Sequence, residues 1–200
     1  LMNGIDNYKK VLDTDFGKEW NERLTAERQV RMLGFMPRSP RQISANVVIN
    51  SMDDLSGLKL RAPERDYYVE SLRALGANPT PMAFAEVYTA LQTGIVDGQE
   101  NPVGVIYNNG LHKLQKYMTL DGHVYAADFI LVSDEFFQSL SPAEQAVVAR
   151  AARVAGNMGR SIQQWSTAEG VNKVQAEGMQ VYSPTADEIA AFAEKAQPAV

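Results

Sequence analysis

The sequence predicts an α/β fold, because strand-sized segments alternate with helical ones along its 200 residues. Three observations support this prediction. Hydrophobic residues make up 45% of the chain, which is enough for a buried core. Glycine or proline separates most of the segments. The capping-box pattern Ser141-Pro142-Ala143-Glu144 opens one helical segment that is much longer than the others.

The first half of the chain is expected to start with a helix, in which Phe16, Trp20 and Leu24 recur every four residues among charged ones. Four segments bounded by turn residues and rich in apolar or β-branched side chains then predict strands. They span residues 29–36, 42–49, 58–62 and 95–100. Apolar spacing closed by glycine predicts helices over 66–76 and 85–93. Pro102 marks a place where a further helix can begin, since its missing N–H is not needed there.

The second half is dominated by the long helix, which is expected to run from Pro142 toward Gly178. Three more strands are predicted over residues 115–120, 124–133 and 179–182. A last helix is expected to start after Thr185, within a second capping signature, and to end near Pro198.

Composition excludes several classes of protein. Nineteen Lys plus Arg against 24 Asp plus Glu give a net charge of −5, so binding to nucleic acid or to an anionic membrane is not expected. The absence of cysteine excludes disulfides, thiolate metal sites and a cysteine nucleophile, and it suits an exported protein. No apolar run approaches the ~20 residues that span a bilayer. Residues 1–6 lack the features of a signal peptide, so any export signal is expected to be absent from this chain.

The residues that usually perform catalysis are scarce. His112 and His123 are the only histidines, neither stands in a metal-ligand spacing, and no nucleophile or phosphate-loop motif occurs. We expect both histidines to be structural, and the acidic pairs at 53–54 and at 64 and 66 to be solvated or to serve at helix starts. The sequence therefore predicts no enzyme, no metal site and no cofactor.

Arginine is more informative, because four arginines fall at turns and at the ends of predicted elements. They are Arg38, Arg41, Arg61 and Arg65. Arg61 closes a predicted strand, where α/β proteins place ligand contacts, and a guanidinium can hold a carboxylate with two parallel hydrogen bonds. An ordinary solvated arginine remains the alternative. Phe84 fits a core position as well as a ligand platform, and Asn101 fits a helix N-cap.

Three ordered motifs carry a resemblance to a known family. They are G-L-K-L-R-A-P over residues 57–63, L-G-A-N-P-T-P-M-A-F-A-E-V-Y-T-A-L-Q-T-G over 75–94 and V-D-G-Q-E-N-P over 96–102. Together they closely resemble the solute-binding proteins of TRAP transporters, the tripartite ATP-independent periplasmic carriers, of the C4-dicarboxylate-binding type. Softer similarity extends from residues 30–35 through 41–43 to 140–145, so that it covers most of the chain.

The resemblance implies a two-lobed periplasmic binding protein fold with crossing strands and a long bracing helix. Lobe I would comprise residues 1–38 and 127–165, and lobe II residues 39–126 and 166–200. Family members begin with a strand–helix–strand segment that we expect this chain to lack, which would leave lobe I incomplete.

The resemblance also implies roles for individual residues. The arginine of the L-R-x-P motif, Arg61, would be the carboxylate clamp, and Asn101 a second carboxylate contact from the same lobe. Four further contacts are implied: a polar one at Arg41, an aromatic wall at Phe84, a pocket-side polar group at His123 and a substrate-specific contact at Glu64.

The function implied in this way is capture of an organic acid anion in the periplasm and its delivery to the membrane permease subunits of a TRAP transporter. A dicarboxylate or a related keto or hydroxy acid is expected first and a sugar acid next. Two alternatives stay open: a ligand-sensing module that uses the same pocket for signalling, and a small-acid enzyme, which would lack a base with a positioned partner.

Overall fold

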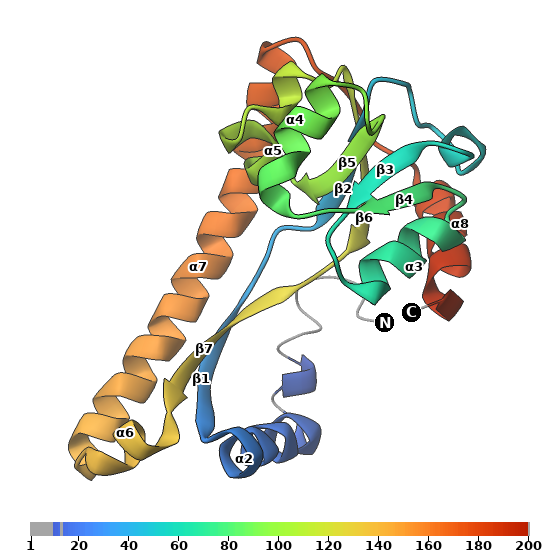
Figure 1. Cartoon of the computed structure of the whole chain (residues 1–200). Coiled ribbons are helices and arrows are strands. Elements are labelled where there is room, and N and C mark those ends of the chain that lie inside the picture. Colours follow the sequence, from blue (N-terminus) through green and yellow to red (C-terminus); the bar gives the residue numbers. More distant parts are fainter. Residues whose placement is uncertain (1–9, 13, 200) are drawn as a thin grey trace. The chain divides into compact units, whose positions relative to one another are not determined.

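The protein is described by a computed structural model that covers residues 10–12 and 14–199 (Figure 1). The chain divides into two compact units. Unit 1 comprises residues 1–39 and 125–165, and unit 2 comprises residues 40–124 and 166–200. Strands and helices alternate along most of the chain, so the predicted α/β class is confirmed.

Unit 1 is built around a two-stranded antiparallel sheet. Its elements are α2 (Asp15–Arg28), β1 (Val30–Pro37), β7 (Ala127–Ser133), α6 (Asp134–Ser139) and the first part of α7 (Pro142–Ala176). The side chain of Asn21 ties α2 to β1, because it donates to the carbonyl of Met32 over 3.1 Å and accepts from its N–H over 2.8 Å. Arg31 of β1 forms an ion pair of 2.6 Å with Asp134 at the start of α6. The sequence did not indicate α6, because six residues are too few to show a helical period.

Helix α7 begins where the capping box predicts. The N–H of Ser141 donates to Glu144 over 2.8 Å, and the N–H of Glu144 donates back to the Ser141 hydroxyl over 3.4 Å. The helix runs for 35 residues, of which 142–165 belong to unit 1 and 166–176 to unit 2. Gly156 lets it approach β1, since a Cβ there would lie 2.5 Å from the carbonyl oxygen of Phe35. Within the described ranges, no helix has the length and apolar character needed to cross a membrane.

Unit 2 contains a mixed six-stranded sheet in the order β4-β3-β5-β2-β6-β8. The strands are β2 (Arg41–Ala45), β3 (Lys59–Ala62), β4 (Asn78–Pro81), β5 (Gly98–Pro102), β6 (Tyr117–Val124) and β8 (Gln180–Tyr182). Strands β4, β3 and β5 are parallel, β2 is antiparallel to β5 and β6, and β8 is parallel to β6. The sequence did not indicate β4, which contains two prolines; its place at the edge of the sheet tolerates them.

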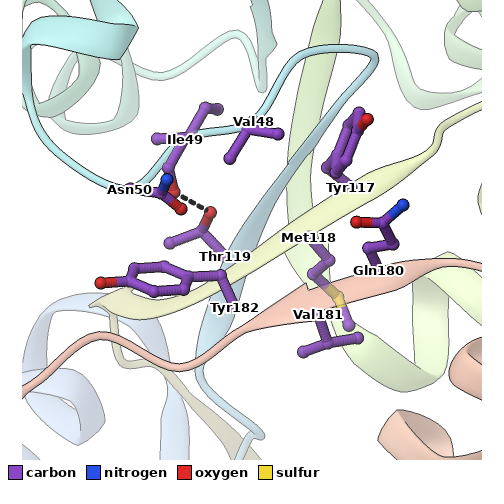
Figure 2. Close-up of a pocket in the computed structure, with 9 residues that line it drawn as sticks. All are labelled: Val48, Ile49, Asn50, Tyr117, Met118, Thr119, Gln180, Val181 and Tyr182. Carbon is purple, nitrogen blue, oxygen red and sulfur yellow. Dashed lines mark hydrogen bonds between the residues drawn. The ribbon is translucent and has the colours of Figure 1, made fainter.

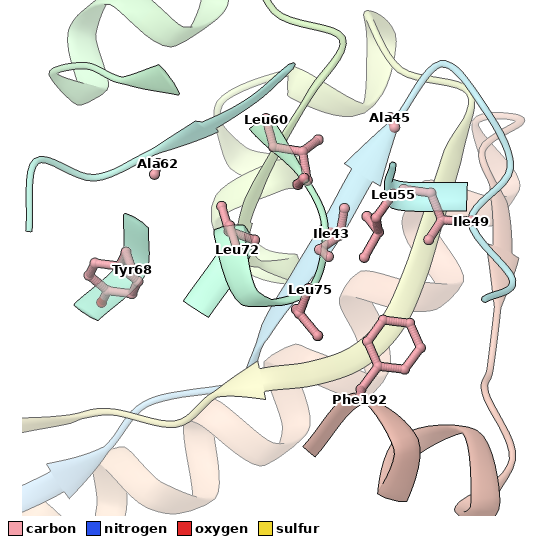
Figure 3. Close-up of a cluster of buried hydrophobic side chains, with 11 residues drawn as sticks. Ile43, Ala45, Ile49, Leu55, Leu60, Ala62, Tyr68, Leu72, Leu75 and Phe192 are labelled. Atoms are coloured by element: carbon pink, nitrogen blue, oxygen red, sulfur yellow. The ribbon is translucent and has the colours of Figure 1, made fainter. Parts of the chain in front are cut away.

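Helices supply two hydrophobic clusters of unit 2. The helices that belong to unit 2 alone are α3 (Asp66–Ala74), α4 (Val87–Gln92), α5 (Val103–Asn108) and α8 (Ala186–Ala196). The first cluster joins β2 and β3 to α3 and α8, and Figure 3 shows it. The second joins α4 and α5 to Met118 of β6 and to Val174 in the last turns of α7.

The strand pleat decides which side chains share a face of this sheet. Ile43 lies opposite Glu100, whereas Ser44 lies opposite Gln99 on β5 and Met118 on β6. Successive side chains point to opposite faces, so Ser44 and Gln99 share one face and Glu100 lies on the other. Arg61 of β3 is in register with Gln99 and shares its face.

Candidate functional site

The six residues that the sequence singles out all belong to unit 2. Arg61 lies near the end of β3, Arg41 begins β2, Asn101 lies in β5, His123 lies near the end of β6, Phe84 starts a 3-10 turn (Phe84–Glu86), and Glu64 follows β3. The structure brings the first four together around the buried end of β5. Phe84 adjoins Arg61 and remains 43% exposed. Glu64 is exposed, and its negative charge acts to raise the pKa of Arg61.

Arg61 is a buried cation whose hydrogen-bond and ring contacts are neutral. Its Nε and Nη2 atoms donate to the carbonyl oxygen of Met82 over 3.1 and 2.8 Å, and its guanidinium lies 5.8 Å from the centre of the Phe84 ring. Two of the five guanidinium N–H groups are used in this way. Burial lowers the pKa of Arg61, and the charge of Arg41 lowers it further, while the charges of Glu100 and Glu64 oppose this lowering. Arginine nevertheless stays charged in proteins, so its electrostatics favour an incoming anion.

Arg41 differs from Arg61, because its charge is already matched. Nε and Nη2 hold the two carboxylate oxygens of Glu100, the latter over 2.6 Å, and Nη2 also donates to the Glu100 carbonyl over 2.8 Å. The guanidinium lies 4.8 Å from the ring centre of Tyr68. Burial by itself lowers the pKa of Arg41, but the hydrogen bond and charge of Glu100 outweigh it and raise that pKa.

Arg41 also orients Asn101. Its Nη2 donates to the Asn101 Oδ1 over 2.9 Å, and the Nδ2 of Asn101 donates to Oε1 of Gln99 over 2.6 Å. Asn101 is a strand residue, and the position before α5 is occupied by Pro102. The helix-cap interpretation of Asn101 is therefore wrong, because the strand continues through this residue.

His123 lies between two carboxylates. Its Nε2 is 3.2 Å from Glu100, and its Nδ1 is 2.7 Å from Asp121 Oδ2, although the latter pair lacks hydrogen-bond geometry and is an ion pair only. The side chain is 2% exposed. Burial alone would lower the pKa of His123, but the charge of Asp121, followed by Glu100, raises it to about 10. Burial likewise favours neutral Glu100, yet His123 and Arg41 hold the pKa of that carboxyl below its ordinary value.

These contacts form a charge cluster in which each cation is paired with a carboxylate, and Arg61 lies outside these pairs. Arg41 and His123 provide two cations, and Glu100 and Asp121 provide two carboxylates, all of them buried. Unit 2 therefore offers one buried guanidinium without a carboxylate partner in the described chain.

Glu100, Asp121 and Gln99 also belong to the site, although they are not among the residues that the sequence predicts. The sequence contains one signal for them: the segment that forms β5 reads Gly-Gln-Glu-Asn-Pro, and in the structure all five residues are buried. A central strand whose buried side chains include Gln, Glu and Asn indicates that polar groups satisfy one another inside the protein.

A separate pocket of about 170 Å³ lies in unit 2, away from the charge cluster. Figure 2 shows its lining, to which β6, β8 and the segment after β2 contribute: Val48, Ile49, Asn50, Tyr117, Met118, Thr119, Gln180, Val181 and Tyr182. None of these side chains is charged, so the pocket offers no counter-charge to an organic anion. In the part of the chain that the structure describes, no three His, Asp or Glu side chains are grouped to hold a metal ion.

Comparison with known proteins defines the class to which this fold belongs. Residues 1–200 match the family model described as bacterial extracellular solute-binding protein, family 7. The chain belongs to this family.

Individual relatives of the chain are also solute-binding proteins. The solute-binding protein RD1_1052 of Roseobacter denitrificans is 33% identical over 175 residues, which are 88% of this chain and 54% of that protein. The sialic acid-binding periplasmic protein SiaP of Vibrio cholerae is 31% identical over 194 residues, or 97% of this chain and 60% of SiaP. The chain thus spans little more than half the length of these relatives.

Solved structures confirm the fold. The TRAP periplasmic solute-binding protein RD1_1052, with bound L-galactonate, has a TM-score of 0.82 at 31% identity over 97% of this chain and 65% of its own. A second Roseobacter denitrificans protein, with bound 3-deoxy-D-manno-oct-2-ulosonic acid, has a TM-score of 0.90 at 30% identity over 99% of this chain and 67% of its own. The predicted resemblance to TRAP solute-binding proteins and the binding-protein fold are confirmed. The family consists of periplasmic binding proteins.

Proposed function

We propose that the chain binds an organic acid anion through Arg61 and delivers it, in the periplasm, to the permease of a TRAP transporter. The observation that carries this proposal is the contrast between the arginines: Arg41 forms an ion pair with Glu100, whereas Arg61 donates its hydrogen bonds to the Met82 carbonyl and forms no ion pair with any described residue. A carboxylate that reached Arg61 would supply the missing counter-charge.

Asn101 supports the same assignment. Its Oδ1 is engaged by Arg41 and one N–H by Gln99, so the group that it retains for a ligand is its second N–H donor. A guanidinium and an amide donor on one face of the sheet suit a carboxylate, which only accepts hydrogen bonds. Phe84, beside Arg61, would cover the apolar side of the ligand.

The structure alters the order of candidate ligands. The expectation of a dicarboxylate used Arg41 for a second carboxylate, but Glu100 already neutralises that guanidinium. One buried arginine without an ion-paired carboxylate among the described residues favours one carboxylate on a molecule that is otherwise polar and uncharged. We therefore place a sugar acid before a dicarboxylate, in keeping with the galactonate, galacturonate and glucuronate bound to relatives.

His123 and Glu64 receive different roles in this proposal. His123 acts through Glu100 and Arg41 rather than on the ligand, because its ring is enclosed between two carboxylates. Glu64, exposed two residues before α3, is a candidate for contact with the distal part of the ligand. Units 1 and 2 correspond, in this proposal, to lobes I and II.

The test is a binding screen with matched acids and neutral sugars. Calorimetry and thermal unfolding would compare D-galacturonate, L-galactonate and succinate with D-galactose, which lacks the carboxylate; ligand binding to the native state raises its melting temperature. We expect binding of a sugar acid, none of galactose, and recovery of the unchanged acid in NMR spectra of the incubated mixture. Failure of every acid to bind would contradict the binding role, and a new product would contradict the absence of catalysis.

A further inference from the structure

We propose that Gln99, Ser44 and Gln115 are positioning residues, whose chain of hydrogen bonds fixes the side-chain amide of Asn101 with an N–H available to the ligand. This inference rests on the proposed function, since it assigns Asn101 a ligand. None of the three positioning residues needs to contact the ligand itself.

The chain of hydrogen bonds is continuous and buried. Asn101 Nδ2 donates to Gln99 Oε1 over 2.6 Å, and Gln99 Nε2 donates to the Ser44 hydroxyl over 2.8 Å. The Ser44 hydroxyl donates to Gln115 Oε1, and Gln115 Nε2 donates to the backbone carbonyl of Ser44 over 3.0 Å. Ser44 and Gln99 are fully buried, and Gln115 and Asn101 are 2% and 4% exposed. Water therefore has little access to these groups.

The donor-to-acceptor direction of this chain of hydrogen bonds is fixed at both of its ends. A side-chain amide or a hydroxyl can reverse its donor and acceptor, but a guanidinium only donates and a backbone carbonyl only accepts. Arg41 at one end requires the oxygen of Asn101 to face it. The Ser44 carbonyl at the other end requires the amino group of Gln115 to face it.

The two ends impose the same donor-to-acceptor direction on Ser44 and Gln99, which lie between them. With its amino group on a carbonyl, Gln115 offers its oxygen to Ser44, so the Ser44 hydroxyl donates to Gln115 and accepts from Gln99. Gln99 then has only its oxygen left for Asn101, which matches the orientation that Arg41 imposes. Reversal of any one member would leave a buried donor or acceptor without a partner, which is costly.

The sheet explains why these residues meet although they are far apart in sequence. Ser44 and Gln99 are opposite one another on β2 and β5, and Gln42 and Asn101 form the next pair on the same face. Gln115 comes two residues before β6, which pairs with β2 on its other side. The order β5-β2-β6 thus places one amide on each side of the Ser44 hydroxyl.

The test compares variants within the chain of hydrogen bonds with a matched control outside it. Ser44→Ala and Gln99→Met interrupt the chain; Thr119→Val removes another buried hydroxyl, which donates to Ile49 instead. With D-galacturonate, or the acid that binds in the screen above, we expect about tenfold weaker binding by Ser44→Ala and Gln99→Met, in line with the loss of one hydrogen bond. Thr119→Val should bind as the unaltered protein does, even where its melting temperature falls.

A second readout needs no ligand. In NMR spectra of the ligand-free protein, the Asn101 side-chain amide protons should exchange slowly with solvent, and faster in Gln99→Met but not in Thr119→Val. Unchanged exchange in Gln99→Met, or equal loss of affinity in all three variants, would overturn the positioning role. If no acid binds the unaltered protein, the proposed function fails, and the amide exchange still decides whether the chain of hydrogen bonds holds Asn101.

Discussion

The two units of this protein differ in how they bury their side chains. Unit 2 has a six-stranded sheet with two hydrophobic clusters and a buried polar site. In the described part of unit 1, a two-stranded sheet is accompanied by two buried hydrophobic residues, Phe137 and Ala152, which are still 8% and 7% exposed. Two strands alone are marginally stable. Unit 2 therefore holds the core and the candidate site, and unit 1 contributes comparatively little burial.

Helix α7 shows the same difference in side-chain burial between units 1 and 2. Its residues 142–165, in unit 1, carry large hydrophobic side chains that are 49–68% exposed: Val147, Val154, Met158, Ile162 and Trp165. Their spacing of three, four or seven places them along one stripe of the helix. In unit 2, by contrast, Val174 of the same helix is fully buried in the second cluster.

The largest expected effect comes from truncating one leucine side chain in each unit and comparing the losses of stability. Leu60→Ala in unit 2 should lower the free energy of unfolding by about 2–5 kcal/mol, because it removes a fully buried side chain from the first cluster. Leu131→Ala in unit 1, where the side chain is 51% exposed, should cost well under half as much. Urea unfolding measures both. Equal losses would show that unit 1 has a core comparable to that of unit 2.

The next largest effect compares replacement of Arg61 in unit 2 with replacement of Arg31 in unit 1. Arg61→Met should weaken binding of the screened acid by about 2–5 kcal/mol, or more than tenfold in Kd. Arg61→Lys should not restore it, because an ammonium cannot reproduce the guanidinium fork. Arg31→Met is the control, since Arg31 of unit 1 already pairs with Asp134. Calorimetry that gave near-normal affinity for Arg61→Met would refute the clamp.

The pH dependence of stability tests the charge cluster of unit 2. The pKa of His123 in the folded protein, about 10, lies above its ordinary value of 6.5. The stabilisation of the folded state by protonated His123 is therefore complete below pH 6.5 and is lost as the pH rises toward 10. The free energy of unfolding falls over this range with a slope of at most about 1.4 kcal/mol per pH unit. In His123→Asn this part of the slope should vanish. Urea unfolding at pH 6.5, 8 and 9.5 measures it, and identical slopes in the two proteins would exclude an imidazolium at this position.

The smallest effect concerns the exposed stripe of α7. Ile162→Lys should change the free energy of unfolding by less than about 0.5 kcal/mol, as is usual for exposed positions. Val174→Lys, the matched change on the buried part of the helix, should prevent folding or destabilise the protein severely. A large loss from Ile162→Lys would mean that the stripe is buried in solution, and the contrast between the units would weaken.

Elements with a local signal could be predicted from the sequence. The capping box at Ser141 places the start of α7, and the second one at Thr185 places α8. The limits of two strands differ from the predicted ones. The strand expected over 95–100 is β5 at 98–102, because Pro102 ends the strand rather than entering a helix. The strand expected over 42–49 ends at Ala45, where its pairing with β5 and β6 stops.

The sequence by itself determined the class of the fold, the family and the residues worth testing, because helix caps, strand alternation and ordered motifs are encoded within short stretches of chain. Only the tertiary structure decided that Arg41, rather than Arg61, is paired with a carboxylate among the described residues. Arg41 and Glu100 are 59 positions apart, and their pairing depends on the antiparallel neighbours β2 and β5. His123 joins them because β6 lies on the other side of β2. The charge of a buried side chain depends on such distant partners, since burial strengthens each interaction and penalises each charge that lacks one.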